Sequence, residues 1–354
     1  MSKVRILFQP PVDVDNTNAQ SLNVREIVLR LDPARFDCTL WYWREPDPRL
    51  RDQPFIRLLP LPRRRKTFRI LRELLSGYDL IAYMDYSPAS YLYLRAPRSL
   101  RRKTKVVFHA EAPMAQLVNP PRLLRFLVQG TTARGDIHTG ITPYVARDIG
   151  EAVHREVRYV LPVGVDLDFF SPPAHRSNAT PTVLFAGTLI ERKGPMLVLD
   201  AAARFPNVKF RLVGKGRDGY DDALRAKARE WRLTNVAFEG ARPQAEVAEI
   251  MRQCDIFLLP SRLEGLPKVT LEASASGLPC IVFRDYETPS VIDGVTGFQV
   301  STTEEMMDRL QELIANPALR SKMGESARLH ARKFDWDTVA RLWEEAYLEI
   351  AARP

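Results

Sequence analysis

The residues best placed to do chemistry follow a short apolar run in the second half of the chain. The run Thr182–Ala186 leads into Gly187-Thr188-Leu189-Ile190-Glu191-Arg192-Lys193-Gly194 and then into a segment with helical spacing. Backbone amides, the adjacent cations Arg192 and Lys193, and a helix N-terminus would then meet at one strand end, a combination that suits a diphosphate. Taken alone, Arg192 and Lys193 could also be a solvated pair of cations in a loop.

A second segment, residues 260–272, carries two carboxylates. Glu264 and Glu272 are eight residues apart, and a helix starting near Pro267 would leave Glu264 in the preceding loop and place Glu272 inside it. The two could then reach different parts of one ligand. We expect Glu264 to accept hydrogen bonds from sugar hydroxyls, the amides of Leu266–Lys268 to face a phosphate, and Glu272 to accept from a ribose. Glutamate pairs at this spacing are also common at helix ends.

Alternating strands and helices must position these residues. Apolar periodicity predicts helices near Ser21–Leu31, Met196–Ala203, Asp221–Trp231, Ala245–Arg252 and Val269–Ala275. It predicts strands at Val4–Phe8, Cys38–Trp43, Leu80–Tyr83, Val106–His109, Thr182–Ala186, Val208–Val213, Asn235–Phe238, Asp255–Leu259 and Pro279–Phe283. This rhythm indicates βαβ units, and therefore an α/β fold with parallel, doubly wound sheets whose ligands bind at the carboxyl ends of the strands.

The length of the chain suits two such domains. A chain of 354 residues exceeds one ordinary α/β core. The proline-rich stretch between 160 and 182 suits an interdomain connection. We therefore expect an N-terminal Rossmann-like domain over 1–170, a second one over 171–334, and a final helical segment over 335–354.

Composition excludes several classes of protein. The chain is 45% hydrophobic and 27% charged, which is typical of a globular protein. No stretch approaches the ~20 apolar residues that span a bilayer, and the start lacks a signal peptide, so we expect a cytoplasmic protein. Cys38, Cys254 and Cys280 have no metal-ligand spacing and are expected to be buried thiols.

The positive charge belongs to the N-terminal half. Residues 1–165 carry a net charge of +11 and the remainder −2. The cations gather in two clusters, Arg63, Arg64, Arg65, Lys66, Arg69 and Arg72, and Arg95, Arg98, Arg101, Arg102, Lys103 and Lys105. Such clusters attract anionic membrane surfaces, although they also suit a solvated face. No RNA-module signature accompanies them, so we expect no nucleic-acid partner.

Three other motifs do not define a site. Residues 214–219 match G-x-G-x-x-G, but they follow the second strand of their domain, whereas the dinucleotide fingerprint follows the first. The triplets 13–15 and 166–168 match D-x-D without any further ligands, so no bound metal is expected. The sequence contains neither a P-loop nor a Gly-x-Ser-x-Gly elbow.

The order of motifs in the second half resembles family-4 retaining glycosyltransferases (glycosyl transferases group 1) of the GT-B fold. The matching segments are G-T-L-I-E-R-K-G (187–194), R-L-V-G-K-G (211–216), V-A-F-E-G (236–240), 255–279 and G-V-T-G-F (294–298). The segment after Val160 also resembles the family's interdomain motif, with Val163 in place of the usual asparagine. The resemblance implies two Rossmann-like domains facing a central cleft, with the donor held by the second domain and the acceptor by the first. It also implies that the final helix returns to the first domain.

Site residues follow from that resemblance position by position. Lys193 matches the family's diphosphate lysine, and Glu264 and Glu272 match its two motif glutamates, contacting the donor sugar and the ribose. His109, after an apolar strand, matches a histidine beside the donor sugar, although it could instead satisfy a strand-end hydrogen bond. With His109, Lys193 and Glu264 as catalytic residues, the expected donor-binding set is Gly187, Thr188, Arg192, Lys193, Gly214, Arg242, Glu264, Gly265, Leu266, Pro267, Lys268 and Glu272.

The chain departs from the family pattern at two places. Thr188 stands where an arginine usually follows the first glycine, and Arg192 is expected to compensate. The early glycine pair is absent, and residues 16–20 occupy that region. On the acceptor side we expect Asn16, Asn18 and Glu111 to make contacts.

The expected function is retaining transfer of a hexose-type sugar from a UDP- or GDP-sugar to a glycan, lipid-linked or small-molecule acceptor. We expect it to serve cell-surface polysaccharide or glycoconjugate assembly, at the inner face of the membrane. Neither a cofactor nor a metal is expected, since cations and amides would stabilise the departing diphosphate. The alternatives are a catalytically degenerate basic binding module and a GT-B nucleotide-sugar epimerase or phosphorylase.

Overall fold

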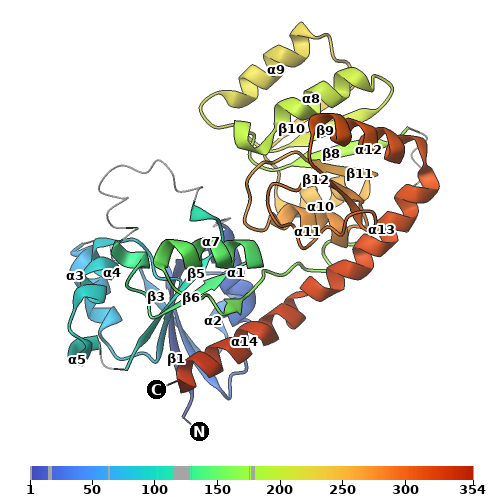
Figure 1. Ribbon diagram of the computed structural model, residues 1–354. Coiled ribbons are helices and arrows are strands. Elements are labelled where there is room, and N and C mark those ends of the chain that lie inside the picture. Colours follow the sequence, from blue (N-terminus) through green and yellow to red (C-terminus); the bar gives the residue numbers. More distant parts are fainter. Residues whose placement is uncertain are drawn as a thin grey trace. The chain divides into compact units, whose positions relative to one another are not determined.

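The computed structural model describes residues 2–14, 18–62, 64–101, 103–114, 128, 130–174, 176 and 180–353. The chain divides into two compact units (Figure 1). Unit 1 comprises Met1–Val163 together with Trp336–Pro354, and unit 2 comprises Gly164–Asp335. The chain therefore leaves unit 1 once and returns to it for its last helix.

Unit 1 is built on a seven-stranded parallel sheet in the order β3-β2-β1-β4-β5-β6-β7. Its strands are β1 (Val4–Pro11), β2 (Phe36–Tyr42), β3 (Ile56–Pro60), β4 (Leu80–Ala82), β5 (Lys105–Ala110), β6 (Ile137–Gly140) and β7 (Tyr159–Val160). From β1 the sheet continues through β2 to β3 on one side, and from β4 to β7 on the other. The topological switch point therefore lies between the neighbouring strands β1 and β4.

Helices accompany this sheet along the sequence. They are α1 (Ala19–Val28), α2 (Pro48–Arg51), α3 (Lys66–Leu74), α4 (Pro88–Arg95), α5 (Arg98–Arg101), α7 (Pro143–Val153) and α14 (Trp336–Ala352). Ser87 and Thr142 cap α4 and α7 through their side chains, which supplies partners for free amides of the first turn. The helix α14 packs against α1, which explains its place in unit 1 (Figure 1).

Unit 2 repeats the same strand order on a six-stranded parallel sheet, β10-β9-β8-β11-β12-β13. Its strands are β8 (Thr182–Ala186), β9 (Lys209–Val213), β10 (Val236–Gly240), β11 (Ile256–Leu259), β12 (Cys280–Phe283) and β13 (Gly297–Val300). Every residue of β8, β11 and β12 is buried, as expected for parallel strands covered on both faces. The switch point lies between β8 and β11.

The helical elements of unit 2 are η2 (Glu191–Lys193), α8 (Pro195–Arg204), α9 (Tyr220–Glu230), α10 (Gln244–Arg252), α11 (Lys268–Ala275), α12 (Thr303–Ala315), α13 (Pro317–Ala331) and η3 (Arg332–Phe334). Thr302 and Asn316 cap α12 and α13. Two chain segments meet at the boundary with unit 1, because the amide of Val165 donates to the carbonyl of Phe334 at 2.8 Å.

The predicted fold class is confirmed, since both sheets are parallel and both follow the Rossmann-like order. All nine predicted strands are present, and the five helices fall within three residues of their expected bounds. The final helix begins at Trp336, one residue after the predicted start of the final helical segment at 335. Cys38, Cys254 and Cys280 are free and buried, as expected.

Candidate functional site

Three loops meet at the switch point of unit 2. They follow β8, β9 and β11, which are adjacent parallel strands, so all three emerge at the same edge of the sheet. In open α/β sheets this crevice at the carboxyl ends of the strands is the usual place for a ligand. The two segments with the strongest chemical signals, 187–194 and 260–272, are the loops on either side of the reversal.

The loops after β8 and β9 run in contact because both begin with glycine. The Gly187 amide donates to the Val213 carbonyl at 2.9 Å, and the Leu189 amide donates to the Lys215 carbonyl at 3.0 Å. Gly214 has a φ of +147°, and a Cβ there would lie 1.8 Å from the Gly187 carbonyl oxygen. Only glycine therefore allows this close approach of the two loops.

The loop after β8 also packs on the loop after β11. Gly194 has a φ of +67°, and a Cβ at this residue would lie 2.4 Å from the Pro260 carbonyl oxygen. The Arg192 carbonyl accepts hydrogen bonds from the Arg262 amide at 3.2 Å and from the Ser261 hydroxyl at 3.3 Å. These contacts fix the position of η2, which carries the two cations.

The carboxylate of Glu264 is the centre of the resulting cluster. Its Oε1 lies 3.0 Å from Lys193 Nζ and 3.1 Å from an Arg192 guanidinium nitrogen, and it accepts a hydrogen bond from Ser261 Oγ at 2.8 Å. Glu264 is 7% exposed. Arg192 also donates to the Leu263 carbonyl. Two cations thus share one buried carboxylate, which suits the capture of a more highly charged anion.

Several predicted donor residues lie within these loops. Gly187 lies against Lys193, since a Cβ at Gly187 would be 3.6 Å from Lys193 Nζ. Thr188 is half-buried in the same loop. Gly265, Leu266 and Pro267 are buried directly before α11.

The helix α11 begins next to these residues. Its N-cap, Pro267, makes no side-chain capping bond, so the first amides of α11 have no side-chain cap. Lys268 is half-buried at its first position. Negative groups are favoured at a helix N-terminus, and these amides lie immediately after the loop that carries Glu264.

Glu272 lies on α11 and is only partly exposed. Burial raises its pKa, against the opposing effects of Lys268 and of a hydrogen bond from the side chain of Gln244. The charged carboxylate is therefore held in surroundings that favour its neutral form, a pattern that is more frequent at functional positions than elsewhere.

We expect Glu272→Gln to stabilise the ligand-free protein while weakening donor binding. Because the folded-state pKa is raised, the stabilisation contributed by protonated Glu272 is present below its unfolded pKa and is lost as the pH rises through the folded value. At pH 7.5 the variant should melt about 2–4 °C higher than the parent, and the gap should close towards pH 4. Affinity for a nucleoside diphosphate should fall about 10- to 100-fold, the effect of losing a hydrogen bond to a charged group. Melting curves across pH, with and without nucleotide, measure both effects. A variant that melts lower at neutral pH would contradict the first.

Arg242 lies in a different network. It is exposed in the loop after β10, where it pairs with Glu246 at 3.2 Å and with Glu239 at 3.6 Å. The structure thus places Arg242 in ion pairs of its own rather than with the carboxylate of Glu264. Its role in donor binding stays a prediction.

In unit 1, His109 is near the end of β5 with both ring nitrogens engaged. Nδ1 lies 2.5 Å from Thr139 Oγ1, and Nε2 lies 3.1 Å from the Tyr347 hydroxyl of α14. The ring packs against Tyr83 and Trp343, with centroid separations of 4.3 and 4.6 Å. His109 is 8% exposed, and its hydrogen bonds fit the structural alternative left open by the sequence. Its catalytic role stays a prediction.

The sequence did not anticipate the aromatic partners of His109, nor Ser261 beside Glu264. Trp343 and Tyr347 are more than 230 residues away from His109 in the chain, so no local pattern could pair them. Ser261 precedes Glu264 by three residues, and this spacing before a helix was the one local signal for their contact.

We expect the His109 imidazole to stay neutral from pH 5 to pH 8. Burial lowers the pKa of His109 to about 3, below the value of about 6.5 in the unfolded chain. As the pH falls from about 6.5 towards 3, the unfolded chain therefore takes up a proton that the native ring does not, and the free energy of unfolding decreases. The measurement is the pH dependence of the histidine ring resonances, with His109→Gln used for assignment. A midpoint within that range would refute the expectation.

The expected acceptor-side residues of unit 1 are only partly described. Asn16 lies outside the described residues. Asn18 is the N-cap of α1, and its side chain accepts from the Gln20 amide at 2.9 Å. Glu111, just after β5, accepts from Asn23 Nδ2 of α1 at 2.7 Å. The structure thus joins the end of β5 to α1, beside the switch point of unit 1.

The D-x-D triplets have structural roles in the described residues. Asp13 is buried, and its carboxylate accepts from the amides of Trp43, Arg44 and Glu45 at 2.6–3.1 Å. Asp166 accepts from the amides of Asp168 and Phe169. Both carboxylates therefore organise turns.

Two units with the same Rossmann-like strand order define the GT-B fold class. Anabaena Alr3699/HepE, solved in complex with UDP and glucose, has this fold at a TM-score of 0.77 and 18% identity, covering 97% of this chain and 99% of that one. Residues 169–330 match the family described as glycosyl transferases group 1.

Two named relatives each match a little over half of this chain. A D-inositol 3-phosphate glycosyltransferase of Corynebacterium jeikeium is 31% identical over 215 residues, which cover 54% of this chain and 51% of the relative. A GDP-mannose-dependent monoacylated alpha-(1-6)-phosphatidylinositol monomannoside mannosyltransferase of Corynebacterium glutamicum is 30% identical over 231 residues, covering 58% and 60%. The chain thus spans about half the length of the curated relatives it matches.

Proposed function

We propose that the protein is a retaining glycosyltransferase that moves a hexose-type sugar from a nucleoside-diphosphate donor to a glycan, lipid-linked or small-molecule acceptor. The observation that carries this proposal is the cluster of Lys193, Arg192 and Glu264 at the switch point of unit 2. The family of residues 169–330 and the glycosyltransferase names of the relatives support a transferase. HepE, which shares the fold, was solved with UDP and with UDP-glucose, and one relative is named for GDP-mannose. The proposal therefore includes both UDP-sugars and GDP-sugars as donors.

The proposed chemistry follows from the charge that a departing diphosphate develops. As the bond between the anomeric carbon and the phosphate oxygen breaks, negative charge grows on the leaving phosphate. Lys193, Arg192 and the first amides of α11 are preorganised donors of the kind that stabilise such charge. Glu264 would accept from a sugar hydroxyl and Glu272 from the ribose. We propose that this set of cations and amides makes a divalent metal unnecessary.

The first experiment is a thermal-shift screen of the full chain against UDP, GDP, ADP and their sugar conjugates, with and without EDTA. A ligand that binds only the native state raises the melting temperature. A selective shift that EDTA leaves unchanged is expected, together with donor turnover that depends on an acceptor. Donor binding without turnover on any acceptor would favour the degenerate binding module, and donor turnover without an acceptor would favour an epimerase.

We further propose that unit 1 docks on an anionic membrane through α3, α4 and α5. These helices and the segments beside them expose eight cations, Arg64, Arg65, Lys66, Arg69, Arg72, Arg95, Arg98 and Lys103. Phe68, Leu92 and Leu100 are 66%, 48% and 58% exposed among them. The stretches 64–72 and 88–105 contain no acidic residue. Among the described residues no helix is long and apolar enough to cross a bilayer.

Replacing Arg64, Arg69 and Arg72 by glutamine should therefore weaken binding to phosphatidylglycerol vesicles about 100-fold at low salt. Each cation near such a surface contributes about 1 kcal/mol. Sedimentation of the full chain with vesicles of graded anionic content measures the effect, and salt should reduce binding of the parent protein.

The matched control removes three exposed cations of unit 2, Arg229, Arg232 and Lys322. This variant has the same net charge as the first and should bind vesicles like the parent. Equal losses in both triple variants would show that net charge, and not the surface of α3 to α5, decides membrane binding.

A further inference from the structure

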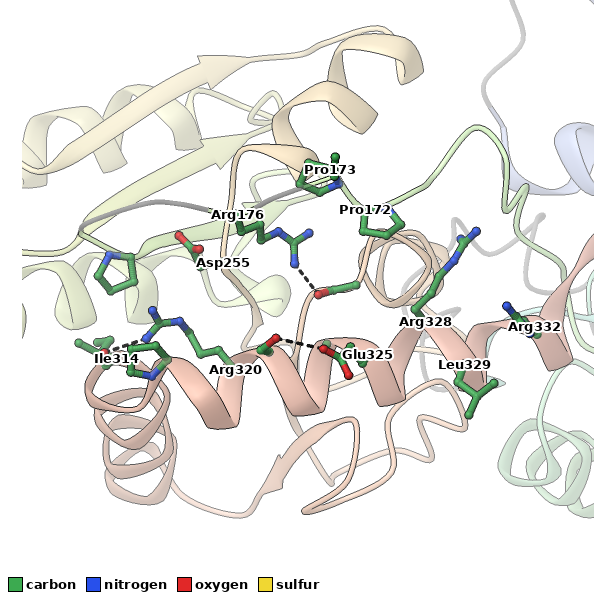
Figure 2. Close-up of a pocket in the computed structure, with 16 residues that line it drawn as sticks. Pro172, Pro173, Arg176, Asp255, Ile314, Arg320, Glu325, Arg328, Leu329 and Arg332 are labelled. Atoms are coloured by element: carbon green, nitrogen blue, oxygen red, sulfur yellow. Dashed lines mark hydrogen bonds between the residues drawn. The ribbon is translucent and has the colours of Figure 1, made fainter.

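A cavity of about 750 Å³ lies in unit 2 at the edge of the sheet where the strands begin. Pro181 and Asp255, which directly precede β8 and β11, line it, whereas the loops carrying Lys193 and Glu264 follow the opposite ends of these strands. One wall is a face of α13, and Pro172, Pro173 and Arg176 lie on the other side of the cavity (Figure 2). The volume falls within the range of small-molecule sites, roughly 300–1,000 Å³.

Four arginines line this cavity, Arg176, Arg320, Arg328 and Arg332 (Figure 2). Three of them donate to backbone carbonyls. Arg320 donates to Leu313 and Ile314 at the end of α12 at 2.6 and 2.9 Å, Arg328 donates to the carbonyls of Leu167, Phe170 and Ala275, and Arg176 donates to those of Ser276 and Gly277.

Within the described residues, none of the four guanidinium groups forms an ion pair with a carboxylate. Their positive charge is thus not neutralised by direct contact. The Nε of Arg176 is buried and has no hydrogen-bond partner among the described residues. Burial lowers the pKa of Arg176 and of Arg328, and the charge of Arg332 lowers that of Arg328 further. The nearby carboxylates act in the opposite direction, Asp255 on Arg176 and Asp168 and Asp335 on Arg328. Unneutralised guanidinium groups beside a cavity attract an anion.

The cavity also has two carboxylates. The Oδ2 of Asp255 accepts from the Thr182 amide at 2.8 Å, and Glu325 accepts from the Ser321 hydroxyl at 3.2 Å (Figure 2). Four positive charges against two negative ones leave the lining positive. Ser321 and Glu325 add polar groups that could contact hydroxyls of a ligand.

We propose that this cavity is a second anion site of the protein, which takes a small phosphate ester of about the size of a hexose phosphate. Arg320 and Arg328 lie on α13 and Arg332 directly follows it in η3, and their guanidinium groups are planar donors suited to a phosphate. The rings of Pro172, Pro173 and Pro317 supply apolar wall for the carbon skeleton. A free inorganic phosphate would fill only a small part of this volume.

The site borders both segments through which the chain passes between the units. Arg328 holds the carbonyls of Leu167 and Phe170, shortly after the chain enters unit 2 at Gly164, and Arg332 lies three residues before it leaves at Asp335. A phosphate bound by Arg328 and Arg332 would therefore lie beside an arginine that contacts the first segment and an arginine that belongs to the second.

The test is calorimetry and thermal shift of the full chain with glucose 6-phosphate, glycerol 3-phosphate, inorganic phosphate and glucose. Glucose 6-phosphate should bind and raise the melting temperature, inorganic phosphate should bind more weakly, and glucose should not bind. Tighter binding of glycerol 3-phosphate would assign the site to a lipid headgroup within the same phosphate-ester chemistry. Arg320→Gln and Arg332→Gln should each weaken the preferred ester at least about tenfold. Arg332 is exposed, so its replacement keeps the test valid if Arg320→Gln does not fold.

Two control variants separate this site from the donor loops. Lys322→Gln removes an exposed cation from the same helix, outside the cavity, and should leave binding of the ester unchanged. Lys193→Ala should also leave it unchanged, because Lys193 is at the opposite edge of the sheet. The proposal is overturned if no phosphate ester binds the parent protein, or if Lys193→Ala removes binding while both arginine variants retain it. Neither result depends on sugar transfer.

Discussion

Lys193→Ala is expected to lower the rate of sugar transfer about 100- to 1,000-fold and to weaken binding of the nucleoside diphosphate. Lys193 Nζ lies 3.0 Å from Glu264 Oε1 and close to Gly187, at the edge of the sheet where the loops after β8, β9 and β11 meet. A cation at this place would contact the phosphate in the ground state and more strongly as charge develops on departure. Both binding and turnover should therefore suffer, and turnover more.

The measurements for Lys193→Ala are steady-state kinetics and UDP or GDP affinity of the purified variant. Lys209→Ala is the matched control, because Lys209 is an exposed lysine at the beginning of β9, at the other edge of the same sheet. This control should transfer sugar like the parent. A folded Lys193→Ala protein with near-normal turnover would remove Lys193 from the proposed site.

The fold could be predicted from the sequence where apolar runs were continuous. β8, β11 and β12 are buried on both faces, so their residues are apolar apart from Thr182, and their bounds were predicted to within one residue. β3, β6, β7 and β13 were not predicted. β3 has only five residues, which are half-buried or exposed, and β13 begins at Gly297, whose Cβ would lie 2.0 Å from the Cys280 carbonyl oxygen. Glycine permits this close pairing but gives no strand signal.

The candidate site was predictable to the extent that it is local in sequence. The loop with Lys193 and the loop with Glu264 each had a recognisable pattern. The switch point between β8 and β11 explains why these two residues, 71 positions apart, meet. The surroundings of His109 and the arginine-lined cavity combine segments that are distant in sequence. Arg328, for example, holds the carbonyl of Leu167, 161 positions away. Such contacts depend on packing, which periodicity does not encode.

Glu264→Gln is expected to separate donor binding from transfer, and the two should move in different directions. Glutamine retains the shape of the side chain but removes the negative charge that Arg192 and Lys193 share, so the potential around these cations becomes more positive. A nucleoside diphosphate should therefore bind at least as tightly as before. Transfer should fall about 10- to 100-fold, because the sugar hydroxyl loses a charged acceptor. Glu191→Gln, in the same loop but exposed, should change neither nucleotide affinity nor the rate of transfer.

If nucleotide affinity and transfer instead fall together in Glu264→Gln, as expected for Lys193→Ala, the role of Glu264 would be to hold the two cations in place. The proposed contact with the donor sugar would then be wrong.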